Sequence, residues 1–173
     1  MIYVLAFVIA WLLSVLQASA MPYLHVLGVT PDFVLIFAAC FAVMRSQDEA
    51  LVVVPIAGIL RDLATSDPLG TSLLGFAPLV VLAAAVRLRS MDSRFVPAIA
   101  VVAAGTVSHA VISILVLALT GQRIDAGDAV IRVVLPLTIV NPLFTAIVYL
   151  PVSWIPRAKR PRMSGRGPLA SPL

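Results

Sequence analysis

Residues able to do chemistry are scarce in this sequence, and most lie inside or beside long apolar stretches. They are Asp32, Arg61, Asp62, Asp67, His109 and Asn141. Charged and amide side chains are costly in a lipid bilayer, so each one indicates a partner within the protein or a functional site. No nucleophile–base–acid set, phosphate-binding loop or HExxH motif accompanies them. The sequence therefore predicts neither an enzyme nor a bound metal or cofactor.

The adjacent residues Arg61 and Asp62 are the most informative of these features. On a helix their side chains point about 100° apart, so they do not pair well with each other. In an antiparallel hairpin that turns at residues 46–47, position 32 lies level with both. We therefore predict an ion pair between Asp32 and Arg61, with Asp62 facing the bundle interior or another polar partner. The alternative is that Arg61 and Asp62 lie at the outer interface and extend into water.

The segment Thr30-Pro31-Asp32 has the composition of a helix start. Thr30 suits the N-cap position, Pro31 suits the first helical residue, and Asp32 complements the positive end of the helix dipole. These residues predict that the second helix begins here.

The segment Ser66-Asp67-Pro68 likewise predicts the start of the fourth helix, with Asp67 as the cap and Pro68 as the first helical residue. Gly70 follows at once. Because it has no side chain, it permits close approach of another backbone.

Two further polar residues lie within apolar stretches. No second titratable residue shares the stretch that contains His109, so we interpret it as a neutral packing residue rather than a proton relay. Pro142 frees the carbonyl of Thr138 and predicts a kink in the last helix. The amide of Asn141 is expected to bond freed backbone groups or to hold a neighbouring helix.

The elements that must position these residues are apolar helices. Of the 173 residues, 61% are hydrophobic and 12% are charged, and the mean hydropathy is +1.09, which is typical of an integral membrane protein. About 20 helical residues cross a bilayer. The stretches that approach or exceed this length are 2–22, 69–86, 95–119 and 133–155.

The segment 31–65 is harder to interpret, because its uncharged halves, residues 33–44 and 50–60, are short for a membrane span. They form either two short spanning helices or a re-entrant hairpin. We predict two short helices, which gives an all-α membrane domain of six transmembrane helices over residues 1–156.

Arginine and lysine positions orient the helices. With a cytoplasmic N-terminus, nine basic residues fall on the cytoplasmic side and three on the outer side. The nine are Arg45, Arg87, Arg89, Arg94, Arg157, Lys159, Arg160, Arg162 and Arg166, and the three are Arg61, Arg123 and Arg132. Both termini are therefore expected in the cytoplasm.

Residues 157–173 are basic and rich in Pro, Gly and Ser, which predicts a disordered cytoplasmic tail. The ordinary role of such a tail is to anchor the last helix, and the alternative is contact with anionic lipid or with a cytoplasmic partner. The net charge of +4 comes largely from this tail, and it points to lipid rather than to nucleic acid.

Small residues recur at a spacing of four in two stretches, at Ala6, Ala10, Ser14 and Ala18, and again at Ala100, Ala104 and Ser108. Such stripes let helices approach closely. They predict either packing within this chain or docking of another protein's transmembrane helix.

Residues 30–87 resemble the MreD family, the rod shape-determining membrane proteins of bacteria. The family pattern has a Pro-Asp before an apolar helix, then Gly-x-x-x-Asp-Leu, then Pro-Leu-Gly. Here these elements fall on Pro31-Asp32, on Gly58 to Leu63 with Asp62 as the aspartate, and on Pro68-Leu69-Gly70. The Asn141-Pro142-Leu143 segment resembles the family's last helix. The candidates for structural or partner-binding roles are Pro31, Asp32, Gly58, Arg61, Asp62, Asp67, Pro68, Gly70 and Asn141.

The resemblance implies a fold similar to the substrate-binding membrane subunit of energy-coupling-factor vitamin transporters. It also implies a non-enzymatic scaffold of the cell-elongation machinery in the bacterial inner membrane. That scaffold would bind the bitopic protein MreC directly, and would link MreB filaments to the RodA polymerase and a class B penicillin-binding protein. The alternative is a vitamin-binding subunit, but the outer loops 21–30, 63–68 and 120–129 contain only one aromatic residue, Tyr23, for the pocket it requires.

Overall fold

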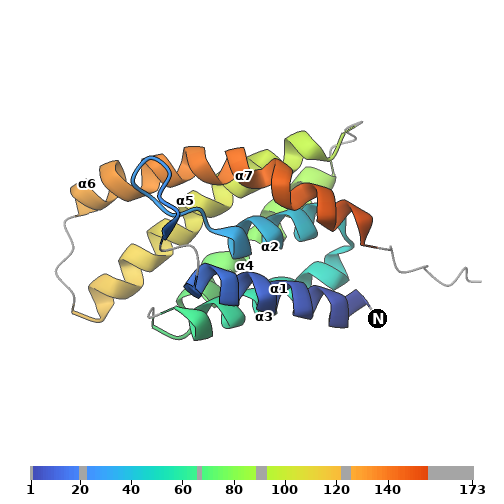
Figure 1. Ribbon diagram of the computed structural model, residues 1–173, viewed down its shortest axis with the longest axis horizontal. Coiled ribbons are helices and arrows are strands. Elements are labelled where there is room, and N and C mark those ends of the chain that lie inside the picture. The colour runs from blue at the N-terminus through green and yellow to red at the C-terminus, as the bar shows by residue number, and fades with distance from the viewer. Residues whose placement is uncertain (1, 20–22, 66–67, 89–92, 122–125, 156–173) are drawn as a thin grey trace, which may run out of the picture.

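The protein is a bundle of helices (Figure 1). The computed structural model describes residues 2–19, 23–65, 68–88, 93–121 and 126–155. Apart from one isolated bridge between Val26 and Val29, the regular elements of these residues are helical. They are α1 (Ile2–Ser19), α2 (Phe33–Met44), α3 (Gln47–Ala64), α4 (Thr71–Arg87), α5 (Phe95–Leu119) and a final helix made of α6 (Ala126–Ala129), η2 (Val130–Val134) and α7 (Leu135–Trp154). The predicted six-helix, all-α fold is confirmed.

Helix α2 is the centre of the bundle. Its sequence is apolar throughout, all its residues from Val34 to Met44 are buried, and it contacts α1, α3, α4, α5 and α7. In Figure 1, α1 and α3 lie on one side of α2, and α7 lies on the other. Because protein encloses α2, its 12 residues, about 18 Å long, form a core rather than a lipid-facing span.

Three helices are long and apolar enough to cross a membrane, namely Ile2–Ser19, Phe95–Leu119 and Gly127–Trp154. Helices α2 and α4 are shorter apolar helices of the same bundle. Many of the large hydrophobic side chains of the long helices point outward, Trp11, Val111 and Leu143 among them, as expected for a protein whose outer surface meets lipid.

Arginines gather at one end of the bundle, which we call the Arg45 end. One guanidinium nitrogen of Arg45 donates to the carbonyl of Ile155, and Arg87 donates to the carbonyl of Arg45. Arg94 Nη1 donates to the carbonyl of Met44 at 2.8 Å. These cations satisfy carbonyls at helix C-termini, where the dipole is negative. Figure 1 shows that α1 begins and α7 ends at this same end.

Helix α3 begins earlier than residue 50, where the sequence analysis placed the start of its apolar half. Ser46 is its N-cap: the Glu49 N–H donates to Ser46 Oγ, and the Ser46 N–H donates to the Glu49 carboxylate. This capping box starts the helix at Gln47. The Ser-x-x-Glu spacing was present in the sequence, but the charges were interpreted as a break between two apolar halves.

The last helix also begins earlier than predicted, at residue 126 rather than 133. Asp128 and Arg132 form an exposed i,i+4 ion pair along its first part. The five-residue π-helical segment η2 follows, and the N–H of Leu135 donates to the carbonyl of Val130. Pro136 comes next, and its ring would clash with a carbonyl four residues back, so the wider turn accommodates it. The kink at Pro142 stays a prediction.

Helices α3 and α4 approach closely at Gly58. A Cβ atom built on Gly58 would lie 2.9 Å from Leu73 Cα and 3.0 Å from the Ser72 carbonyl oxygen. Both are backbone atoms that cannot move without separating the helices. The glycine is therefore required by the contact between α3 and α4.

We expect Gly58→Ala to lower the free energy of unfolding by about 1–3 kcal/mol, because one added carbon overpacks the interface. Equilibrium unfolding in detergent measures the loss. The control is Val52→Ile, which adds one carbon at an exposed position of the same helix. Equal stabilities of the two variants would contradict the close contact.

Candidate functional site: a polar network that joins six helices

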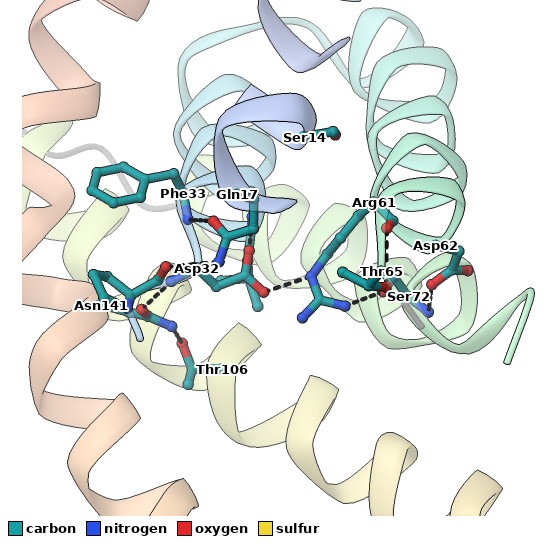
Figure 2. Close-up of polar contacts among 12 residues, drawn as sticks. Ser14, Gln17, Asp32, Phe33, Arg61, Asp62, Thr65, Ser72, Thr106 and Asn141 are labelled. Carbon is teal, nitrogen blue, oxygen red and sulfur yellow. Dashed lines mark hydrogen bonds and ion pairs between the residues drawn. The ribbon is translucent and has the colours of Figure 1, made fainter. Parts of the chain in front are cut away.

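One hydrogen-bonded network, centred on Asp32, connects α1, α2, α3, α4, α5 and α7. Figure 2 shows Asp32 between Arg61 on one side and Asn141 on the other. The remaining side chains of the network are Gln17, Asp62, Ser72 and Thr106. Because each helix contributes at least one of these side chains, the network fixes all six helices at one level of the bundle.

Asp32 is the N-cap of α2. Its Oδ1 accepts from the N–H of Leu35 at 2.9 Å, and the helix begins at Phe33. The prediction that Thr30 caps this helix and Pro31 opens it was wrong. Gln17 Nε2 donates to the Pro31 carbonyl, and the Asp32 N–H donates to Asn141 Oδ1 at 2.9 Å. These tertiary bonds hold Pro31 outside the helix, and they leave the stronger capping side chain of Asp32 at its start.

The predicted ion pair between Asp32 and Arg61 is confirmed. Arg61 Nε donates to Asp32 Oδ2 at 2.8 Å, and the side chains are only 13% and 7% exposed. The alternative, in which Arg61 and Asp62 extend into water, is contradicted. A buried pair of this kind contributes little relative to apolar packing, but removing one partner leaves an uncompensated charge at high cost.

Arg61 also reaches the next helix. Its Nη1 donates to Ser72 Oγ at 2.6 Å, so one guanidinium connects the starts of α2 and α4 (Figure 2). The planar fork of an arginine suits this geometry, because donors on different edges can bond different helices.

Asp62 faces the interior, as predicted, and its partners are backbone N–H groups of α4. Its Oδ2 accepts from the Gly70 N–H at 2.8 Å, and its Oδ1 accepts from the Ser72 N–H at 2.9 Å. A carboxylate at a helix N-terminus satisfies orphan donors and complements the dipole. Asp62 of α3 is therefore the N-terminal cap of α4, supplied from another helix.

The predicted start of α4 at Pro68 was wrong. The helix begins at Thr71, and the N-cap position belongs to Gly70, which has a left-handed φ of 97°. The Pro68 carbonyl accepts from the Thr71 N–H at 3.1 Å in a turn before the helix. The acceptors for the N–H groups at this helix start come from Asp62 of α3. Asp67, the predicted cap, lies outside the described residues.

Asn141 holds two neighbouring helices, as expected from its position in an apolar stretch. Its Oδ1 accepts from the Asp32 N–H, and its Nδ2 donates to Thr106 Oγ1 of α5 at 2.9 Å. Thr106 in turn donates to the Val102 carbonyl at 2.8 Å. These bonds satisfy the polar atoms of two buried side chains.

Three network residues were missed by the sequence analysis. Gln17 accepts from the Phe33 N–H at 3.1 Å through its Oε1, while Ser72 and Thr106 accept from Arg61 and Asn141. The signal for Gln17 was available, because it is the only amide in the apolar run of α1. Ser72 and Thr106 carry no such signal, since hydroxyl residues are common in membrane helices.

His109 packs against the neighbouring helix α4. Its ring meets Phe76 edge to face at 5.4 Å between centroids, and a Cβ on Gly75 would come within 2.2 Å of His109 Nδ1. The missing side chain of Gly75 therefore makes room for the imidazole. This geometry supports the interpretation of His109 as a packing residue.

The fold and the network together define a polytopic α-helical membrane protein whose buried polar residues hold its helices together. Within the described residues, no group of three His, Cys, Asp or Glu side chains is placed to hold a metal ion. The chain belongs to the rod shape-determining protein MreD family, whose model matches residues 1–157. That family is defined by its part in rod shape determination. No curated protein and no solved structure matches the chain, so the similarity to vitamin-transporter subunits stays a prediction.

The ion pair yields a double-mutant test. Asp32→Asn keeps a capping oxygen but removes the charge, and Arg61→Met removes the cation. Each change leaves its partner buried and unpaired, so each should lower the free energy of unfolding by about 3–5 kcal/mol, and the double variant should lose less than the sum. The control is the exposed pair Asp128–Arg132, where the same cycle should give less than about 1 kcal/mol. Additive losses at Asp32 and Arg61 would contradict their coupling.

The capping of α4 by Asp62 of α3 can be tested by hydrogen exchange. Asp62→Ala removes the acceptor of the Gly70 and Ser72 amides, so hydrogen exchange there should accelerate, with a loss of about 1–2 kcal/mol in stability. Exchange measured by mass spectrometry checks this. The control, Ser46→Ala, removes the cap of α3 and should accelerate exchange at Glu49 instead. Unchanged exchange at the start of α4 in Asp62→Ala would contradict the assignment.

Proposed function

We propose that this protein is a non-catalytic scaffold of the bacterial cell-elongation machinery. It holds the bitopic protein MreC directly, and through it links MreB filaments to the RodA polymerase and a class B penicillin-binding protein. The observation that carries this proposal is the match of residues 1–157 to the MreD family. The polar network supports the non-catalytic part of the proposal, because the buried charged and amide side chains bond to other parts of the chain.

The two small-residue stripes support different roles. On α1, Ala6, Ala10 and Ser14 are buried within the bundle and Ala18 is exposed, so most of this stripe serves packing inside the chain. On α5, Ala100 and Ala104 are exposed and Ser108 is partly exposed. Small side chains on an outward face let a second transmembrane helix approach closely. We assign this face of α5 to the membrane helix of MreC.

The proposed location is the bacterial inner membrane with both termini in the cytoplasm. The arrangement of arginines supports this orientation, since Arg45, Arg87 and Arg94 gather at the end where α1 begins and α7 ends. The basic segment 157–173 follows α7 in the sequence, and we propose that it contacts anionic lipid on the same side.

Co-purification from membranes tests the scaffold. The wild-type chain should retain MreC, and Ala104→Leu should reduce the retained amount at least about tenfold, a change of about 1.4 kcal/mol, because the larger side chain holds the partner helix away. The control is Ala146→Leu, on an exposed position of α7, which should retain MreC normally.

The two parts of the proposal fail separately. If the wild-type chain retains no MreC, the scaffold proposal is wrong. If it retains MreC equally in both variants, the scaffold stands and the assignment of the α5 face is wrong.

A further inference from the structure

A cavity of about 480 Å³ lies beside the polar network, between α5 and the final helix. We call it the α5–α7 cavity. Its lining residues come from α5, from η2 and α7, from the start of α2, and from single positions on α1, α3 and α6. The volume falls within the range of small-molecule sites in proteins.

The cavity exists because α2 is short. Helix α5 has 25 residues and the final helix is longer still, whereas α2 has 12. All three are close together at the Arg45 end, where Arg45 and Arg94 bond the carbonyls of Ile155 and Met44. Helices α5 and α6–α7 therefore extend beyond the start of α2 (Figure 1). Asp32 and its partners form the floor of the space between them.

The floor is polar but its groups are engaged with one another. Asp32 bonds Arg61 and the Leu35 N–H, and Asn141 bonds the Asp32 N–H and Thr106. The charges of Asp32 and Arg61 offset each other at 2.8 Å. A charged ligand would have to break this pair at high cost. The floor therefore favours an uncharged group that donates to the second lone pairs of the Asp32 and Asn141 oxygens.

The walls are aliphatic. They consist mainly of Ile114 and Leu117 on α5 and of Val133, Val134 and Leu137 on the final helix. Among the described lining residues there is no Phe, Tyr or Trp, and the one ring, the imidazole of His109, already packs edge to face against Phe76. A flat ring system therefore finds few stacking partners here. Flexible hydrocarbon fits such walls by dispersion and by exclusion from water.

We propose that the α5–α7 cavity binds an uncharged aliphatic amphiphile, with its hydrogen-bonding end toward the Asp32–Arg61 floor and its hydrocarbon between α5 and α7. This site is separate from the α5 face assigned to MreC, and its existence does not depend on the scaffold function. The side chains of Ala110 and Ser113 face the cavity, whereas Val107, Val111 and Leu115 of the same helix are exposed on the other side.

The test is photolabelling of the whole chain in lipid nanodiscs with an octanol that carries a diazirine on its chain. Adducts mapped by mass spectrometry should exceed those on the exposed face of α5 on the order of tenfold at the cavity positions, which corresponds to about 1.4 kcal/mol. Octanoic acid with the same diazirine, at a pH where it is ionised, should show no such preference.

Filling variants separate the cavity from the lipid. Ala110→Phe occupies the cavity and should reduce its labelling to the level of the exposed face, whereas Val111→Phe adds a ring on the lipid side and should leave cavity labelling unchanged. Size-exclusion profiles check folding, and Leu137→Phe fills the cavity from the opposite wall if Ala110→Phe does not fold. Even labelling of both faces of α5, or cavity labelling that survives filling in a folded variant, overturns the site. Equal cavity labelling by the ionised acid overturns the uncharged class of ligand.

Discussion

The carboxylate of Asp32 is the group on which the rest of this structure depends. A polar group inside a membrane protein cannot turn to water, so its partners must come from the chain itself. Here one oxygen accepts from α2's own backbone and the other accepts from Arg61 of α3. The backbone N–H of the same residue is bonded by Asn141 of α7. One position therefore sets the start of the central helix and its distance from two others.

The network also explains why a short helix can be the core. Helix α2 is buried from Val34 to Met44, and its N-cap Asp32 is only 5% exposed, so the helix starts inside the bundle. An ordinary helix start at that depth would leave N–H groups unsatisfied. Asp32 and Gln17 supply the acceptors for the Leu35 and Phe33 amides. In the same way, Asp62 satisfies the start of α4. Both short helices thus begin on carboxylates held within the protein.

Much of this arrangement was predictable from the sequence, because the cost of charge in lipid is large. The sequence pattern located the helices. It also paired Asp32 with Arg61, because the two residues lie level with each other in a hairpin. The sequence pattern did not locate the helix starts near Pro31 and Pro68. Local capping residues there compete with hydrogen bonds from other helices, and a local pattern does not reveal those bonds. Asp62 can cap α4 because α3 packs beside that helix at Gly58. The early start of the last helix was missed because Asp128 and Arg132 were interpreted as loop charges rather than an ion pair along one helix.

The bond between the Asp32 backbone and Asn141 joins positions 109 residues apart, and this separation has a consequence for biogenesis. During synthesis α2 leaves the ribosome long before α7, so an emerging chain carries an incomplete polar network until its final helix has been inserted. A chain terminated before Asn141 leaves the Asp32 amide and Thr106 without their acceptor and donor in a medium that offers no substitute. The last helix therefore completes the bonding of the network, which stays unfinished in any chain that ends before Asn141.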